Sequence, residues 1–551
     1  MQTKQTQGRP VRPAGSSRIS PLIKVGRKVR LRVQMRCAAP LCLATLTLTA
    51  APLTGTAQEP LSAIDWLGAA YDAQRSGPVL LDPPVAETAA RPRIEVSPLE
   101  TLAVPVGLVP PPATGLPVDL WRGSDPALLT RLIAEAPVQD SPAMQALFYT
   151  LLLAEKLPPT GADEATANRL LLAQIDRLID LGAVDPALAL VDLAGPTGSR
   201  TLFHRWFDTT LLTGQEDRSC TALVAAPYLS PGYPAQIFCT MRNGDWPTAL
   251  LTLESARALG LLEPAQVDLL DRFLNPEFYE GAAPLPAPRN PDPLTFRLFE
   301  AIGERLPSAG LPRAFANADL SDLAGWKSQI EAAERLTRIG ALNPNHLLGL
   351  YTNRRAAASG GVWDRVAAVQ RFDTALTTGS AEAVAKTLPK VWEQMRQIGL
   401  EVPFAHLFGD RLAGLPLTGP TAALAWQVRL LSPDYETAAH TPPATGRPET
   451  FLAALAMGEP GGVAAPTDRA RAIAAGFDHA DSRPVDLPED LRAALDNGRL
   501  GEAILRTIVL FDRGARGNPA ELSAALAALR AVGLEDTARR AALQLMLIGR
   551  G

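Results

Sequence analysis

The sequence is poor in the residue types that many catalytic and metal-binding sites use. In 551 residues there are five histidines and four cysteines. The histidines are widely scattered, and neither a His-Glu-x-x-His motif nor any paired metal-ligand spacing occurs. No lysine follows a glycine, which excludes a P-loop, and Ser-x-x-Lys and Gly-x-Ser-x-Gly motifs are also absent. We therefore predict a protein without catalytic activity and without a bound cofactor or metal.

Acidic residues are missing from the first 58 positions, which contain ten Lys or Arg residues. This basic stretch ends in an apolar run, residues 38–53, that is shorter than the roughly 20 residues a membrane-spanning helix needs. Small side chains then follow as far as Ala57, as signal peptidase requires. The pattern predicts that residues 1–57 are a signal peptide cleaved after Ala57, with Met35 as an alternative first residue. An uncleaved membrane anchor is the other interpretation of this segment.

Lysine is rare beyond the predicted signal peptide, where only four occur. Removing the ten N-terminal basic residues from the 53 in the chain leaves 43 basic against 57 acidic residues, so the mature protein is acidic. Because binding to phosphates needs clustered Lys and Arg, we expect no nucleic-acid partner. Long apolar runs are also lacking after residue 57. We therefore expect no membrane span after cleavage and an exported protein, periplasmic in preference to secreted.

Two of the four cysteines, Cys220 and Cys239, follow the predicted signal peptide. In an oxidising compartment, an isolated pair with a short intervening loop is expected to form one disulfide. Two buried free thiols are the alternative. The number and spacing of these cysteines exclude a Cys-x-x-Cys redox site and a Cys-rich zinc site.

Proline is concentrated in residues 58–123, where Val, Leu and Thr lie between the prolines. Proline fixes φ and lacks an N–H donor, so this segment should be an extended strap and not a helix. Its apolar content is too high for a free linker, and we expect the strap to lie along the folded body.

From residue 124 onward, apolar residues recur at intervals of three and four, which is typical of amphipathic helices. Alternation of the kind found in strands is scarce. We predict an all-α fold with a helical-repeat region at residues 124–457. After a Gly-rich break, a C-terminal helical block should occupy residues 463–551.

A recurrent joint gives the most information about this repeat. Four helix-like segments end in a glycine that is followed four residues later by a proline, at Gly182, Gly260, Gly340 and Gly399. Glycine takes the left-handed conformation after a helix end, and proline starts the next helix where no N–H is needed. Intervals of 78 and 80 residues between the first three glycines fit pairs of helical hairpins of about 40 residues each. We therefore expect an α-solenoid of stacked helical hairpins; an irregular helical domain with ordinary caps is the alternative.

The segment from Gly244 to Ala256 resembles the tetratricopeptide repeat. A Gly-Asp-Trp turn stands where that family has a Gly-Asp-Tyr-type turn, and the expected alanine, large residue and second alanine are Ala249, Leu253 and Ala256. The resemblance covers about 30 residues and implies a helical hairpin in a protein-interaction scaffold. The Ala-, Leu- and Pro-rich composition is also similar to that of uncharacterised exported alphaproteobacterial proteins, which implies nothing about activity.

Tryptophans are spread through the helical region, and packing in the core is their ordinary role. The alternative is an aromatic binding surface of the kind solenoids present, for which Trp246, Trp326, Trp363 and Trp392 are the candidates. These patterns together predict an exported scaffold that binds a protein or another cell-envelope component. A cell-envelope hydrolase or a polysaccharide-binding protein with an unrecognised site is the alternative.

Overall fold

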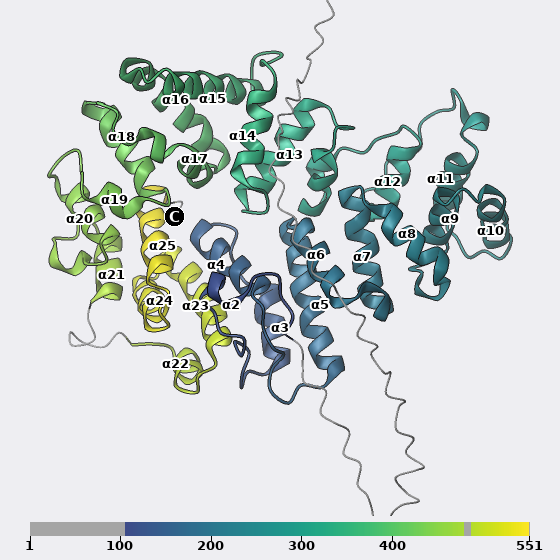
Figure 1. The fold of residues 1–551 in the computed structure, drawn as a ribbon, viewed down its shortest axis with the longest axis horizontal. Coiled ribbons are helices and arrows are strands. Elements are labelled where there is room, and N and C mark those ends of the chain that lie inside the picture. Colours follow the sequence, from purple (N-terminus) through teal and green to yellow (C-terminus); the bar gives the residue numbers. More distant parts are fainter. Residues whose placement is uncertain (1–104, 479–485, 550–551) are drawn as a thin grey trace, which may run out of the picture. The chain divides into compact units, whose positions relative to one another are not determined.

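The computed structural model describes residues 105–478 and 486–549, all of which belong to one compact unit, residues 97–551. The predicted signal peptide, with Met35, and residues 58–104 of the predicted strap lie outside the described residues. Within the described ranges every regular element is a helix (Figure 1). The all-α class predicted from the periodicity is therefore confirmed.

The helices are mostly short, and turns of 3-10 helix (η) lie between several of them. The first part of the described chain forms α2 (Pro111–Thr114), α3 (Pro126–Glu135), α4 (Pro142–Leu153), α5 (Glu164–Leu181), α6 (Val184–Ala194), α7 (Arg200–Thr213), α8 (Glu216–Ala225), α9 (Tyr233–Arg242), α10 (Trp246–Ala258), α11 (Pro264–Leu274) and α12 (Pro293–Ala301). The second part forms α13 (Trp326–Arg338), α14 (Pro344–Asn353), α15 (Val362–Thr377), α16 (Ala381–Ile398), α17 (Glu401–Phe408), α18 (Gly419–Leu430), α19 (Tyr435–Ala439), α20 (Arg447–Ala456), α21 (Asp468–Phe477), α22 (Glu489–Asp496), α23 (Leu500–Ala515), α24 (Pro519–Ala531) and α25 (Glu535–Leu547). The 3-10 turns are η1 (Pro196–Gly198), η2 (Pro227–Leu229), η3 (Pro276–Tyr279), η4 (Ser308–Gly310), η5 (Arg313–Leu320), η6 (Asp410–Leu412) and η7 (Pro460–Gly462).

The four predicted joints all lie between consecutive helices. Their glycines have positive φ angles between 64° and 85°, the left-handed conformation expected after a helix end. Two joints follow the predicted pattern fully, because Pro264 and Pro344 are the first residues of α11 and α14. In the other two, α6 and α17 begin two residues before their prolines, which then lie in the first helical turn.

Neighbouring helices pack against each other in pairs such as α5 with α6, α10 with α11, α13 with α14, and α15 with α16. This pairing agrees with the predicted series of helical hairpins. A large core cluster of buried apolar side chains extends from Leu116 to Leu545, and a second cluster lies between Ile330 and Leu431. Side chains at the end of α25, Leu547 and Ile548, pack against the second cluster, so the last helix contributes to both.

The described end of the Pro-rich segment lies along the helical body, as its apolar content predicts. The prediction that it contains no helix was wrong, because Pro111–Thr114 form the short helix α2, which begins with prolines in its first turn and ends at Gly115. The backbone N–H of Val106 donates to Lys156 O at 3.0 Å, and that of Leu108 donates to Leu153 O at 2.8 Å. Further on, Trp121 is buried, and its ring lies against Gly501 at the start of α23. The segment is thus tied to α4 and to a helix almost 400 residues later.

Helices from the beginning and the end of the described chain are in contact. Helix α4 packs against α25, and α3 packs against α23. A hydrogen bond from the backbone N–H of Ala143 to Gln544 Oε1, at 2.8 Å, closes one of these contacts and caps the first turn of α4.

No helix among the described residues is both long enough and apolar enough to cross a membrane.

Candidate protein-docking face

The four candidate tryptophans have different surroundings and do not form one surface. Trp392 is buried in the second core cluster, where its ring centroid lies 5.8 Å from that of Phe404. Trp326 and Trp363 are half-buried and pack on each other, with their ring centroids 5.0 Å apart. Trp246 is the most open of the four, at 39% exposure. We therefore centre the candidate site on Trp246.

Trp246 is the first residue of α10, and the preceding turn fixes its position. Gly244 has a φ of 87°, and the Asp245 carboxylate caps the helix by accepting a hydrogen bond from Thr248 N at 3.2 Å. The indole N–H donates to the carbonyl of Leu274, the last residue of α11, at 2.9 Å. The indole thus closes the α10–α11 hairpin while part of its ring stays open to solvent.

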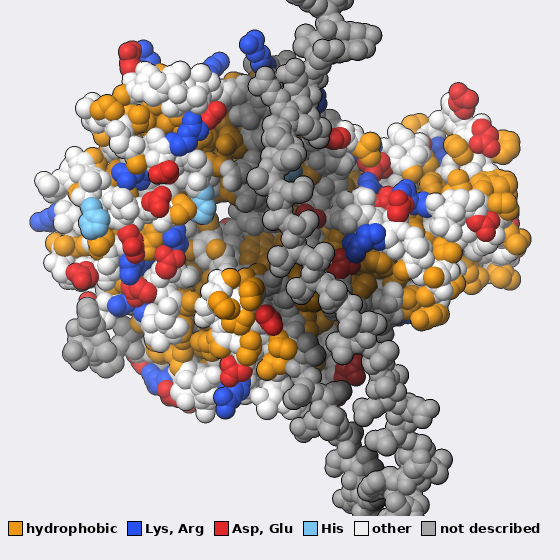
Figure 2. Space-filling view, viewed as in Figure 1, with side chains coloured by type: hydrophobic (Ala, Val, Ile, Leu, Met, Phe, Trp, Pro, Cys, Tyr) orange, Lys and Arg blue, Asp and Glu red, His pale blue; other side chains and the backbone are white. Residues whose placement is uncertain are grey.

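Large exposed hydrophobic side chains are concentrated around this hairpin. Of the twelve among the described residues, eight lie between residues 224 and 278. Figure 2 shows hydrophobic side chains gathered over the region where Figure 1 places α9, α10 and α11. We use the name α10 face for five of these residues: Trp246, Leu251, Leu259, Leu261 and Phe278.

Helix α10 carries apolar side chains around much of its circumference. Ala249, Leu253 and Ala256 are fully buried, which are the three positions that resemble the tetratricopeptide pattern. Leu251 lies on the opposite side and is 67% exposed. The described helices that pack against α10 are α9 and α11. Polar residues such as Glu254 and Ser255 are exposed beside Leu251, so apolar and polar side chains are mixed around this peripheral helix.

The surroundings of the α10 face are acidic. Residues 243–281 include seven carboxylates and two arginines, Arg257 and Arg272. Both arginines are engaged within the chain, because Arg257 contacts Glu254 and Asp271 and Arg272 contacts Glu304, at distances of 3.0–3.1 Å. The apolar side chains therefore lie within a surface of net negative charge.

Helix α9, on which α10 packs, is covalently joined to α8. Cys220 of α8 and Cys239 of α9 form a disulfide with their Cα atoms 4.7 Å apart, which confirms the prediction from their isolation in the sequence. Both cysteines are buried. The bond limits how far α8 and α9 can separate and so supports the hairpin stacked on them.

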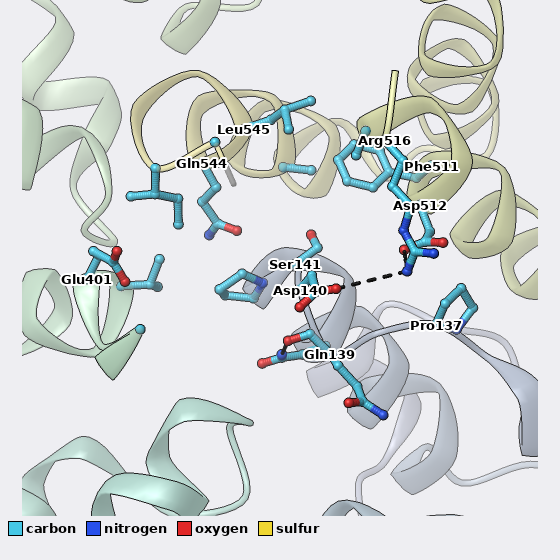
Figure 3. A pocket seen from close by; sticks show the side chains of 18 of the residues that line it. Pro137, Gln139, Asp140, Ser141, Glu401, Phe511, Asp512, Arg516, Gln544 and Leu545 are labelled. Carbon is cyan, nitrogen blue, oxygen red and sulfur yellow. Dashed lines mark hydrogen bonds and ion pairs between the residues drawn. The ribbon is translucent and has the colours of Figure 1, made fainter. Parts of the chain in front are cut away.

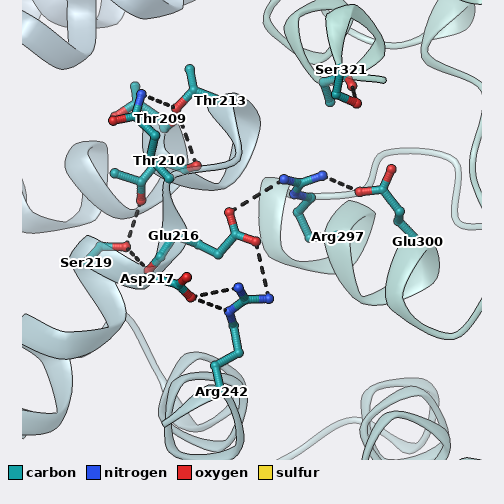
Figure 4. A network of polar contacts seen from close by, with 12 residues as sticks. Thr209, Thr210, Thr213, Glu216, Asp217, Ser219, Arg242, Arg297, Glu300 and Ser321 are labelled. Atoms are coloured by element: carbon teal, nitrogen blue, oxygen red, sulfur yellow. Dashed lines mark hydrogen bonds and ion pairs between the residues drawn. The ribbon is translucent and has the colours of Figure 1, made fainter. Parts of the chain in front are cut away.

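A buried ionic network joins the same helices to α12 (Figure 4). Glu216 of α8 forms ion pairs with Arg242 of α9, at 3.4 Å, and with Arg297 of α12, at 3.5 Å. Arg297 also pairs with Glu300, and Arg242 pairs with Asp217 at 2.7 Å. Glu216 and Arg297 are almost fully buried, and each has two ionic partners, so neither charge is left unpaired. The base of the α10 hairpin is therefore held by buried ionic contacts as well as by the disulfide.

A separate cavity of about 210 Å³ lies between α4, α17, α23 and α25 (Figure 3). Arg516 lies in one wall of this cavity and forms ion pairs with Asp512, at 3.0 Å, and with Asp140, at 4.0 Å. Burial raises the pKa of Asp512 above its ordinary value. Ser141, the only hydroxyl in the lining, caps α4 by accepting from Met144 N at 3.4 Å. The charges and the hydroxyl of this wall are thus engaged in helix capping and ion pairing, and the Arg516–Asp140 contact joins distant parts of the chain.

Among residues 105–478 and 486–549, no group of three or more His, Cys, Asp or Glu side chains is placed to hold a metal ion. Sequence reasoning identified Trp246 but missed Leu251, Leu259, Leu261 and Phe278. A signal for them existed, because α10 shows almost no separation of apolar and polar faces. No protein-family model, no curated protein and no solved structure matches the chain.

Proposed function

We propose that this protein is an exported helical scaffold that binds another protein of the cell envelope, and that the α10 face is its docking surface. The observation that carries the proposal is the concentration of large exposed apolar side chains in the α10 face, on a hairpin whose base is joined by a disulfide and a buried ionic network. Soluble proteins rarely expose large contiguous apolar patches unless these bind a partner. Exposed aromatic residues such as Trp246 and Phe278 are also typical anchors of protein interfaces.

The export part of the proposal is supported by the basic, acid-free N-terminal stretch and its short apolar run. It is tested by expressing the full chain with a C-terminal tag in a Gram-negative host. Mass spectrometry of the tagged protein from the periplasmic fraction should give an N-terminus at Gln58. Recovery of the intact chain from the cytoplasm would contradict export.

The binding part is tested by crosslinking in envelope fractions followed by affinity purification. The triple variant Trp246→Ala/Leu251→Ser/Leu259→Ser should lose partners that the wild type retains. Leu193→Ser is the matched control, because Leu193 is 55% exposed on α6, away from the α10 face. Equal recovery of the same partners by the triple variant and the wild type would contradict docking at this face.

A further inference from the structure

The α10–α11 and α13–α14 hairpins contain the same arrangement of three features, eighty residues apart in the sequence. Trp246 and Trp326 are the first residues of α10 and α13, and each indole N–H donates at 2.9 Å to a carbonyl in the last turn of the following helix. Eight residues after each tryptophan stands a glutamate, Glu254 in α10 and Glu334 in α13. The joints inside the two hairpins, at Gly260 and Gly340, are also eighty residues apart.

In the second hairpin both of these residues are covered by helix α15, which packs against α13 and α14. Trp363 of α15 packs on Trp326, with ring centroids 5.0 Å apart. Two residues later, Arg365 donates both to Glu334 Oε1, at 2.7 Å, and to Glu334 Oε2, at 2.6 Å. Helix α15 therefore contacts the second hairpin through an aromatic ring and a guanidinium, which stand two residues apart in an aromatic-x-Arg pattern.

In the first hairpin the corresponding residues are open. Trp246 is 39% exposed, and the side chain of Glu254 is 49% exposed, whereas that of Glu334 is 9% exposed. After α11 the chain continues through η3 and a Pro-rich stretch, residues 281–292, before α12 begins. The first hairpin thus presents the tryptophan and the glutamate that α15 covers in the second.

We infer that the α10–α11 hairpin binds an amphipathic helix of a partner protein, with an aromatic side chain on Trp246 and an arginine on Glu254. This inference rests on the proposed scaffold function and specifies its partner by chemistry. Such a helix would lie on Trp246 and Glu254 as α15 lies on Trp326 and Glu334, a contact of the kind that amphipathic helices make in other complexes. Its basic residues would meet the seven carboxylates of residues 243–281.

The negative charge around the α10 face favours a partner helix that carries an arginine over two other possible occupants of the face, a second copy of the chain and a lipid surface. A second copy of the chain would bring the same acidic surface against itself, and like charges across an interface oppose binding. An anionic lipid surface would be repelled for the same reason. The arginine of a partner helix gains from the charge, because Glu254 and Asp271 share the single cation Arg257 and keep an excess negative charge.

The probe for this inference is a helix-stapled, fluorescently labelled peptide with the sequence of α15, Val362–Thr377, added to the full-length mature protein. In the intact protein the second hairpin is occupied by its own α15, so the peptide reports on the first. Fluorescence anisotropy should give a dissociation constant of about 100 µM or tighter. Trp246→Ala and Glu254→Lys should each weaken binding about tenfold or more, and Leu193→Ala should not.

A charge exchange gives the sharpest outcome, because Glu254 is exposed and its replacement leaves the core untouched. A peptide in which the arginine corresponding to Arg365 is replaced by glutamate should bind the Glu254→Lys variant better than the wild type. Thermal melting confirms that each variant is folded. Failure of the stapled peptide to bind the wild type would overturn the inference. So would binding to Trp246→Ala and Glu254→Lys that is as tight as binding to the wild type.

Three further results separate this inference from the proposed function. Partners that crosslink equally to the wild type and to Glu254→Lys would preserve a scaffold but overturn the helix site. Self-association of the wild type that Trp246→Ala abolishes, seen by sedimentation velocity, would assign the face to a second copy and also overturn it. Recovery of no partner under crosslinking, with peptide binding intact, would count against the scaffold alone.

Discussion

Arg365 forms a bidentate ion pair with Glu334, in which Nε donates to Oε1 at 2.7 Å and Nη2 donates to Oε2 at 2.6 Å. The Glu334 carboxylate also accepts a hydrogen bond from the hydroxyl of Tyr351 at 2.7 Å. The three residues belong to α15, α13 and α14, so one buried carboxylate fixes the mutual positions of three helices. Burial, with the Glu334 charge, raises the pKa of Tyr351 well above its ordinary value. The hydroxyl therefore stays protonated as a donor.

Replacing Arg365 by alanine should lower the free energy of unfolding by about 3 kcal/mol, because it leaves the Glu334 carboxylate buried without its cation. Urea denaturation followed by circular dichroism measures the loss. Arg371→Ala is the control, since Arg371 is exposed on the same helix. A loss of less than 1 kcal/mol for Arg365→Ala, the range of surface pairs, would show that the pair is not effectively buried.

Reduction of the Cys220–Cys239 disulfide should destabilise the protein by about 3 kcal/mol, the value expected for a closed loop of this length. Thermal melting with and without dithiothreitol measures the shift. The double variant Cys220→Ala/Cys239→Ala should melt at the lower temperature and should not respond to the reductant. A wild type that melts equally in both conditions would contradict a stabilising disulfide.

Asp208 of α7 makes stability depend on pH. Burial, followed by the nearby Asp292, raises the pKa of Asp208 to about 7, although Arg205 opposes the shift. Because the folded-state pKa lies above the unfolded value near 4, its favourable contribution is complete below pH 4 and is lost as the pH rises through 7. Asp208→Asn should therefore raise the melting temperature at pH 8 and have little effect at pH 4. An equal effect at both pH values would contradict this titration.

Gly501 is required by the close approach of Trp121. A Cβ atom at this position would overlap the indole ring, and the Gly501 N–H donates to Leu120 O at 3.0 Å. Gly501→Ala should cost about 1–3 kcal/mol through overpacking and should loosen residues 116–121 from α23. Gly349→Ala in α14 is the control, because an added Cβ there meets nothing within 4 Å. Increased proteolysis near Trp121 only in Gly501→Ala would confirm the attachment.

Local sequence rules predicted much of the fold because helix ends depend on a few neighbouring residues. The four joint glycines, the proline starts of α11 and α14, and the all-α class follow from caps and periodicity. The disulfide also followed, since Cys220 and Cys239 had no alternative partner beyond the predicted signal peptide.

What could not be predicted depends on contacts between distant segments. Nothing near Trp392 in the sequence indicates burial, and nothing near Trp246 indicates exposure, because neighbouring helices decide both. The packing of Trp363 on Trp326 joins α15 to α13, with α14 between them in the sequence. The interval of 37 residues between the two tryptophans does not indicate that they are in contact. The mixed periodicity of α10 marked the helix as unusual, but it could not show which of its side chains are exposed.

The hydrogen bond between Ala143 and Gln544, with the packing of α3 on α23 and of α4 on α25, sets an order for folding. The N-terminal helices are synthesised first, yet the helices that cover them emerge almost 400 residues later. Although α3 also packs on the nearby α5, the contacts of α3 with α23 and of α4 with α25 cannot form until then, and non-local contacts of this kind slow folding. If the chain is exported as we propose, it would benefit from this delay, because the fold is complete only after the last helices are made.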